Sequence, residues 1–139
     1  MLIECMVDSI DQKILAVLKK DSRTSNTSIA KQVGLTEGAV RARITKMLKQ
    51  KVIERFTIEA NEGKNFAIVM VNAKSSTKDV MRELAKLHIS EHAYEISGAY
   101  DGCLIIEGES IDAIDEKIDQ IRALKSVEDT QTFIVLRKW

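Results

Sequence analysis

Residues 34–50 read GLTEGAVRARITKMLKQ, and this stretch decides the fold of the first half of the chain. Gly34 can end one helix in a left-handed conformation, and the Thr36 hydroxyl can cap the next helix almost at once. Glu37 falls in the first turn, where a carboxylate complements the helix dipole, so we expect a helix that extends to about Gln50. Its apolar stripe consists of Val40, Ile44, Met47 and Leu48.

Two shorter helices are predicted before this one. Ser9 with Gln12 fits a capping box, which predicts a helix over residues 10–20. Ser25 or Asn26 can cap a second helix, which buries Ile29, Ala30 and Val33. Two helices joined by a turn of about three residues, after a leading helix, are typical of a helix-turn-helix.

The exposed side of the third helix is narrow and basic. At about 100° per residue, the centre of the apolar stripe lies opposite Gly38, Ala42, Thr45 and Lys49. Arg41 and Arg43 project on either side of this ridge, with Lys46 nearby. Such a helix could enter the major groove of DNA while its cations reach phosphates. The alternative is a charged face that only contacts solvent.

Charge is distributed unevenly, although the net charge is zero. Residues 1–65 hold 12 Lys and Arg against 8 Asp and Glu, a balance of +4, and residues 66–139 therefore carry −4. Within residues 22–51 the tally is 7 against Glu37 alone, or +6. The asymmetry indicates a polyanion partner for the first half only.

The second half alternates strands and helices. Phe56, Ile58 and Ala60 alternate with polar residues, which predicts a connecting strand. Residues 66–73, FAIVMVNA, are apolar on both faces except Asn72, which predicts a strand covered on both sides. Residues 76–79 offer a capping box for a helix, whose expected core residues are Val80, Leu84 and Leu87.

The remaining elements complete a βαββαβ order. Residues 91–109 predict two strands around an Asp101-Gly102 turn. Ser110 can cap a helix, and residues 127–136 predict the last strand. The apolar stripe of that helix contains Ile111, Ile114, Ile118 and Ile121. This order predicts an α+β chain whose C-terminal domain is ferredoxin-like, with both helices on one face of the sheet. Its other apolar face predicts a two-fold homodimer that stacks sheet against sheet.

Residue types exclude several classes of site. Cys5 and Cys103 are far apart in sequence and lie in no CxxC motif, and His88 and His92 have no neighbouring cluster, so we expect no metal, no cofactor and no catalytic residues. No run of about 18 apolar residues is present, which excludes a membrane span and favours the cytoplasm.

Residues 25–53, SNTSIAKQVGLTEGAVRARITKMLKQKVI, resemble the helix-turn-helix of the Lrp/AsnC (feast/famine) transcriptional regulators, in the form common in archaea. Residues 8–25, DSIDQKILAVLKKDSRTS, are similar to their first helix. Lys51 departs from the pattern, because a glycine commonly closes the helix there. The resemblance implies a pseudo-palindromic double-stranded DNA operator and a third helix that reads the major groove. The implied DNA-binding residues are Ser25, Asn26, Thr36, Glu37, Gly38, Arg41, Ala42, Arg43 and Lys46.

The resemblance also implies an amino-acid effector, such as lysine, glutamine, leucine or arginine, held between dimers. The matching loop here is GAYDG, residues 98–102. It implies that Asp101 pairs with the ammonium and that backbone N–H groups meet the carboxylate. The candidate effector residues are Gly98, Tyr100, Asp101, Gly102, Thr130 and Thr132. Turn chemistry alone accounts equally well for the loop, and strand preference for the two threonines.

The expected organisation is a DNA-binding domain over residues 1–53, a connection over 54–65, and an effector and oligomerisation domain over 66–139. In the family the connecting strand pairs in the dimer, and dimers assemble further, which implies an octamer. Two alternatives stay open: a haem-pathway (sirohaem-type) decarboxylase with the same two-part fold, in which His88 or His92 acts, and an architectural DNA-binding protein without an effector.

Overall fold

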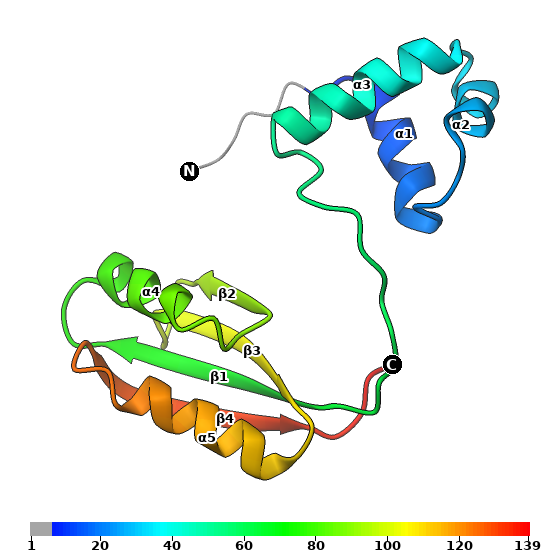
Figure 1. Ribbon diagram of the computed structural model, residues 1–139. Helices are drawn as coiled ribbons and strands as arrows, with labels where there is room; N and C mark the ends of the chain where they lie inside the picture. The colour runs from blue at the N-terminus through cyan, green and yellow to red at the C-terminus, as the bar shows by residue number, and fades with distance from the viewer. Residues whose placement is uncertain (1–6) are drawn as a thin grey trace. The chain divides into compact units, whose positions relative to one another are not determined.

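The structure is a computed structural model that describes residues 7–139. The chain divides into two compact units, the first ending at Ala60 and the second formed by Asn61–Trp139 (Figure 1). The division falls within the segment 54–65 that the sequence predicts as the connection.

Three helices form the first unit: α1 (Ser9–Lys20), α2 (Asn26–Val33) and α3 (Glu37–Lys49) (Figure 1). They pack around a small core because each presents one apolar face to the other two. The buried apolar residues of this core are Ile14, Leu18, Ile29, Ala30, Val40, Met47 and Ile53.

Two of the three predicted caps are confirmed. The hydroxyls of Ser25 and Thr36 accept hydrogen bonds from the N–H groups of Ser28 (3.2 Å) and Ala39 (3.3 Å). Gly34, at φ 72°, ends α2 in the left-handed region as predicted.

The predicted cap of α1 is wrong by one residue. Asp8, not Ser9, is the N-cap, and its Oδ1 accepts from the N–H groups of Ile10 (2.9 Å) and Asp11 (2.8 Å). Asp11 completes the capping box by accepting from the Asp8 N–H. A carboxylate makes stronger, charge-assisted bonds to these N–H groups than a hydroxyl does, so Asp8 prevails over the neighbouring serine.

The end of α3 explains the lysine that departs from the family pattern. Gln50 is the C-cap, and the next residue, Lys51, has φ 59°. This left-handed conformation is the one that glycine adopts at little cost. Lys51 therefore keeps the glycine's backbone geometry while adding a cation.

The strand predicted at residues 55–60 is wrong for the single chain. Residues 54–64 form neither helix nor strand, and the side chains of Phe56 and Ile58 are 50% and 80% exposed. An extended segment becomes a strand only when it pairs with a neighbouring strand, and residues 54–64 take part in none of the strand pairs of the described chain.

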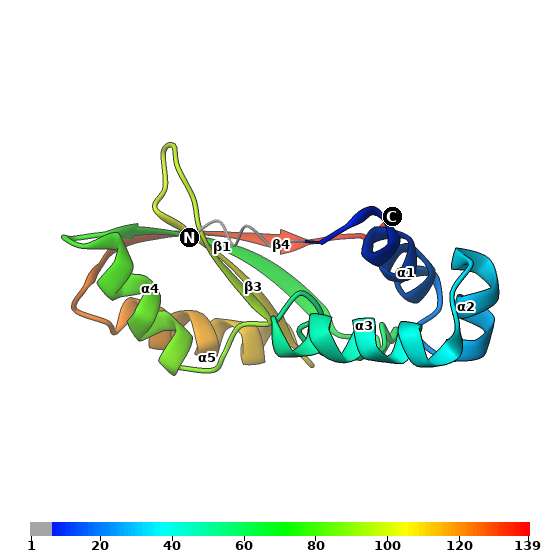
Figure 2. The ribbon, with the colours of Figure 1, turned by 90° about the horizontal axis from the view of Figure 1, so that it is seen from above.

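The second unit is a ferredoxin-like βαββαβ fold, as predicted. Its elements are β1 (Asn65–Ala73), α4 (Thr77–Lys86), β2 (His92–Glu95), β3 (Gly102–Gly108), α5 (Ile111–Arg122) and β4 (Val127–Val135). All strand pairs are antiparallel, in the order β2-β3-β1-β4. Both helices cover the same face of the sheet (Figure 2).

Burial along β1 follows the pleat. Ala67, Val69 and Val71 are buried under the helices, whereas the residues that alternate with them are only half-buried. Within the single chain the helices cover only one side of this strand, and the sequence predicts that a second copy of the chain covers the other side. We call the uncovered side of the sheet the open face; it carries Phe66, Ile68, Met70, Cys103, Ile105, Gln131, Phe133 and Val135.

The two helices of this unit follow their predicted caps. Ser76 and Ser110 accept from the N–H groups of Asp79 (3.4 Å) and Ala113 (3.1 Å). Ile111 does not join the core as predicted, because it occupies the first turn of α5 and lies half-exposed at its end. No helix in residues 7–139 combines the length and the hydropathy needed to span a bilayer.

Candidate nucleic-acid interface and effector site

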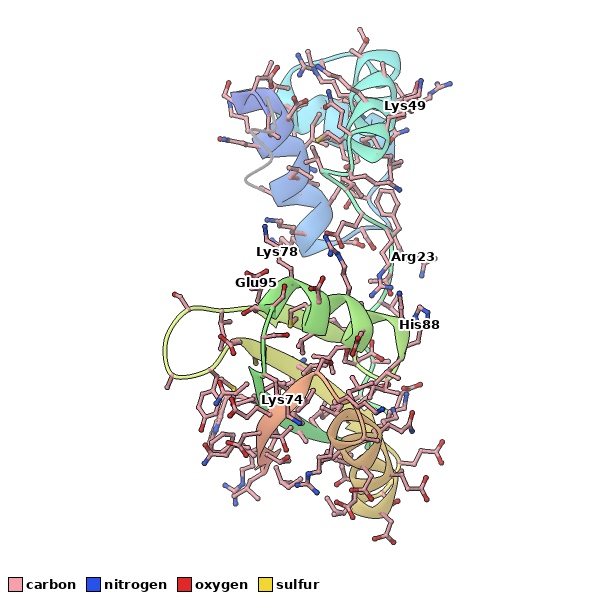
Figure 3. The ribbon with its side chains drawn as sticks, turned by 90° about the vertical axis from the view of Figure 1, so that its left-hand side faces the viewer. Arg23, Lys49, Lys74, Lys78, His88 and Glu95 are labelled. Carbon is pink, nitrogen blue, oxygen red and sulfur yellow. The ribbon has the colours of Figure 1, made fainter. Side chains whose placement is uncertain are left out.

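The predicted ridge on α3 is present. Gly38, Ala42 and Thr45 are exposed, while Val40 on the opposite side of the helix is 0% exposed. Lys49, labelled in Figure 3, is also exposed at the far end of the ridge. The apolar stripe thus faces the core, and the small residues face outward.

Gly38 has no packing role in the described chain. A Cβ added to it would meet no atom within 4 Å, and its φ is not positive. Glycine inside a helix costs about 0.5–1 kcal/mol relative to alanine. Neither space nor backbone conformation requires glycine here, which is the pattern expected where a partner approaches the helix closely.

Arg41 is exposed on α3, and its guanidinium binds the carboxylate of Glu37. Its Nε donates to Glu37 Oε1 (3.1 Å), its Nη2 donates to Oε2, and its side chain is 67% exposed. The pair lowers the pKa of Glu37, chiefly through the hydrogen bond from Arg41, and raises that of Arg41. A side-chain hydrogen bond from Asn26 also lowers the Glu37 pKa, so α2 helps to hold this carboxylate.

Arg43 points the other way, into the helical unit. Its Nη1 donates to Asp8 Oδ2 (2.6 Å) and to Asp11 Oδ1 (2.8 Å), and its side chain is only 30% exposed. These bonds raise the pKa of Arg43, with Asp8 the larger cause. Asp8 has a lowered pKa, first because the Asp11 N–H donates to it and then because of Arg43. Arg43 thereby ties α3 to the start of α1.

The other predicted DNA-binding residues lie at the surface of the same unit. Lys46 is exposed one turn beyond Ala42. Ser25 and Thr36 are exposed at the N-termini of α2 and α3, where backbone N–H groups can meet a phosphate. Together with Arg41 and Gly38, these residues form one exposed surface that includes the turn between α2 and α3 and extends along α3 to Lys46.

The predicted effector loop connects β2 to β3. Gly98 has φ 133°, which glycine tolerates, whereas neither Asp101 nor Gly102 has a positive φ; the predicted Asp-Gly turn geometry is wrong. Asp101 Oδ2 instead accepts from the Ala73 N–H at 2.8 Å, and the Asp101 N–H donates to Val71 O at 3.0 Å. Asp101, the proposed partner of the effector's ammonium group, therefore already uses one carboxylate oxygen to accept a hydrogen bond from the end of β1.

Gly102 lies in close contact with a side chain of α4. An added Cβ would lie 2.8 Å from Met81 Sδ of α4, so a larger residue would displace that side chain. The sequence predicts Gly102 in a turn that needs a positive φ. In the structure its φ is not positive, and the missing side chain instead leaves room for Met81.

The remaining candidates lie on opposite faces of the sheet. Thr130 and Thr132 pair with Val71 and Val69, so they share the helix-covered face. Tyr100 donates from its hydroxyl to Gln131, the residue between them, which belongs to the open face. Within one chain the structure does not bring Tyr100 together with the two threonines.

The two threonines differ in their partners. Thr130 Oγ1 accepts from Arg122 Nε at 3.3 Å, beside a hollow of about 320 Å³. Thr132 Oγ1 is buried and has no hydrogen-bond partner among the described residues. An orphaned hydroxyl of this kind is unusual in a folded chain.

The histidines and the described cysteine form no cluster. His88 lies at the surface after α4 (Figure 3), and His92 stacks with Tyr94 on β2 at a ring-centroid distance of 6.0 Å. Residues 7–139 contain no group of three or more potential metal ligands. Cys103 is a free thiol on the open face, and Cys5 lies outside the described residues.

The sequence patterns missed four residues that hold the candidate sites: Asp8, Asp11, Gln131 and Arg122. Asp11 is 4% exposed, and a buried carboxylate requires a cation partner. Asp8 and Asp11, three residues apart at a helix start, were a visible signal that such a cation exists. Nothing in the sequence identified Arg43 as that cation, because it lies more than 30 residues away.

Comparisons with known proteins agree with this geometry. Residues 7–48 match the AsnC-type helix-turn-helix domain, and residues 66–139 match the Lrp/AsnC ligand-binding domain. The HTH-type transcriptional regulator LysM of Sulfurisphaera tokodaii is 41% identical over 136 residues, covering 96% of this chain and 97% of its own. Escherichia coli AsnC is 28% identical, with a TM-score of 0.74 and coverage of 96% of this chain and 94% of its own.

A further solved structure shares the fold. It is a feast or famine regulatory protein from M. tuberculosis complexed with L-methionine, with 22% identity, a TM-score of 0.83, and coverage of 96% of this chain and 94% of its own. Neither the decarboxylase nor the architectural alternative finds support among these relatives.

An exposed basic helix-turn-helix and a separate βαββαβ unit thus coincide with the two matched domains. The chain belongs to the Lrp/AsnC family of transcriptional regulators, and it is a DNA-binding regulator with a ligand-binding domain rather than an enzyme.

Proposed function

We propose that α3 enters the major groove of a specific operator with the Gly38–Ala42 ridge facing the base edges. The observation that carries this proposal is the ridge itself: its small residues are exposed while Val40 is buried, so the backbone can approach the bases closely. Lys46 and the N-termini of α2 and α3 meet phosphates. Arg43 contributes chiefly by fixing α3 against α1, since its Nη1 is occupied by two carboxylates.

The protein acts as a two-fold dimer on a pseudo-palindromic site. Support comes from the open face, where Ile68 lies between Phe133 and Ile105 in one row across three strands and where Phe133 is about half exposed. A second copy of the sheet would remove this row from water. The resulting pair of recognition helices would meet half-sites about one helical turn of DNA apart, or a multiple of it.

An amino acid is the effector, and it binds around residues 98–102 and the two threonines of β4. The family match to a ligand-binding domain supports this proposal, as does the L-methionine complex of the structural relative. Because Tyr100 and Thr132 lie on opposite faces of one sheet, a site that uses both needs a second copy of the chain. Dimers that share such sites assemble further, up to an octamer, in the cytoplasm.

The effector changes the affinity for DNA only if it binds one assembly state of the protein more tightly than the other. The change in DNA affinity cannot exceed that difference in effector affinity. Coupling of this kind is typically about 1–3 kcal/mol. Lysine, glutamine, leucine and arginine are the first amino acids to test.

Binding to labelled duplex tests the DNA half of the proposal. Replacing Gly38 with leucine blocks the close approach and should abolish binding, while a leucine at exposed Gln32 on α2, away from the ridge, should not. Equal binding by both variants contradicts docking through the ridge.

Thermal unfolding with each of the twenty amino acids tests the effector half. A ligand selective for the folded state raises apparent stability by RT ln(1 + [L]/Kd), about 2.7 kcal/mol at 100 times Kd. Light scattering under the same conditions reports assembly. No shift with any amino acid contradicts the effector proposal and leaves the DNA proposal intact.

A further inference from the structure

Arg41 offers a free fork of hydrogen-bond donors at the recognition surface. A guanidinium has five N–H donors in one plane. The Nε and Nη2 atoms of Arg41 each donate to one carboxylate oxygen of Glu37, which occupies the side of the guanidinium nearest the helix. Nη1 makes no hydrogen bond with any residue in the described part of the chain. The outer edge, with one N–H from Nη1 and one from Nη2, remains available.

The anchoring carboxylate is itself held. Glu37 accepts two hydrogen bonds from Arg41, which lies one helical turn later on the same helix. Glu37 also occupies the first turn of α3, where the helix dipole favours a carboxylate. The plane of the Arg41 guanidinium is thereby set before any DNA is bound.

The chemical partner that matches an outer guanidinium edge is guanine. Two parallel N–H groups of arginine meet the O6 and N7 acceptors of guanine in the major groove, and this pairing is the commonest specific contact between a side chain and a base. A phosphate could also bind the fork, but a phosphate contact carries no sequence information. Arg41 lies beside the Gly38–Ala42 ridge, about one turn after Gly38 and directly before Ala42 in the sequence.

We infer that Arg41 reads a guanine in each operator half-site and that Glu37 is the positioning residue that orients its guanidinium. This inference rests on the proposed docking of α3. It separates the two arginines of the helix, since Arg43 uses its Nη1 within the protein and Arg41 does not.

The test begins by selecting operators from a random duplex pool with the full-length chain. Each guanine of the selected consensus is then replaced by 7-deazaguanine, which removes the N7 acceptor and leaves base pairing intact. For the wild type, one replacement in each half-site should weaken binding about 5-fold, which corresponds to about 1 kcal/mol, the lower end of the range for a bidentate pair, because the O6 acceptor remains.

The decisive variant is Arg41→Met, which keeps the helix preference and much of the length of the side chain but has no hydrogen-bond donor, whereas a lysine could still donate to the O6 and N7 acceptors of guanine. It should lose the sensitivity to 7-deazaguanine at that one position and keep it at every other guanine. Arg23→Met is the matched control, because Arg23 is an exposed arginine outside α3 and takes part in no ion pair within residues 7–139 (Figure 3). It should keep the sensitivity of the wild type at every guanine.

Glu37→Gln tests the positioning role. Discrimination between guanine and 7-deazaguanine should fall, while affinity for random duplex stays equal or rises because a negative charge has been removed. Glu54→Gln makes the same charge change at an exposed residue outside the helices and should leave discrimination unchanged.

The outcomes separate this inference from the proposed function. If the wild type selects no sequence at all, operator recognition by α3 fails, and the inference fails with it. If it selects an operator but Arg41→Met keeps full sensitivity at every guanine, or the consensus contains no guanine, only the assignment of Arg41 is overturned.

Discussion

The candidate site residues of the helical unit lie outside its core, whereas those of the sheet unit also take part in the packing and hydrogen bonds of the fold. In the helical unit, Gly38, Arg41 and Ala42 are exposed and contribute nothing to the core. In the sheet unit, Asp101 accepts a hydrogen bond at the end of β1, Gly102 packs against a side chain of α4, and the Thr132 hydroxyl oxygen is buried. Residues that bind a rigid duplex at the surface need not contribute to the core. Residues of a site built into a sheet serve both the site and the stability of the sheet. Substitutions in the two units should therefore divide differently between stability and function.

The largest stability effect is expected from Asp101→Ala. The variant loses the charge-assisted bond to the Ala73 N–H and should lower the free energy of unfolding by about 1.5–3 kcal/mol. Urea denaturation measures this, with Asp129→Ala as the control, since Asp129 is an exposed carboxylate on β4. Equal stability of the two variants would show that Asp101 is free to serve the effector alone.

A smaller loss is expected from Asp11→Ala in the helical unit. The variant removes a capping-box partner of α1 and one of the two carboxylates on Arg43, which should lower unfolding free energy by about 1–2 kcal/mol. Operator affinity should also fall, because the orientation of α3 is loosened. Asp21→Ala, at the exposed C-cap of the same helix, serves as the comparison for both measurements. Unchanged DNA affinity in the Asp11 variant would contradict a positioning role for the Arg43 contacts.

Gly38→Ala sharpens the contrast, because stability and function should move in opposite directions. The added methyl group meets no atom of the described chain, so the variant should unfold at a free energy about 0.5–1 kcal/mol higher. Operator binding should weaken, since the same methyl group faces the bases. Melting temperature and operator affinity of the wild type and the variant, each measured on the same sample, test whether stability rises while binding weakens. A variant that is more stable and binds as tightly would remove the argument for close approach.

The smallest effect concerns pH and the bond between Asp8 and Arg43. The pKa of Asp8 is lowered in the folded state, so its contribution to stability is present above its ordinary value of 3.8 and is lost as the pH falls through the lowered value. The stability difference between the wild type and Asp8→Asn should therefore be constant from pH 7 to about pH 5 and shrink below pH 4. A difference that grows on acidification would contradict the assigned direction.

Much of the fold could be predicted from short patterns. Caps at Ser25, Thr36 and Ser110 depend on neighbouring residues only, and the βαββαβ order follows from local periodicity. The predicted strand at residues 55–60 failed because a strand depends on a neighbour that the alternation of Phe56 and Ile58 cannot supply.

The candidate site was predictable to the extent that it depends on one helix. Opposite faces of α3 follow from its period, so the exposure of Gly38 and Ala42 could be anticipated. The bonds from Arg43 to Asp8 and Asp11, and from Tyr100 to Gln131, join residues more than 30 positions apart and depend on tertiary packing. No local pattern encodes them.

The backbone at Lys51 has a practical consequence for redesign. A left-handed lysine costs about 1 kcal/mol that a glycine would not, so an optimisation guided only by thermal tolerance would replace it. The replacement would relax the chain just after the recognition helix and delete one positive charge from the half of the molecule that faces a polyanion. Variants selected for thermal stability alone would therefore bind their operator more weakly.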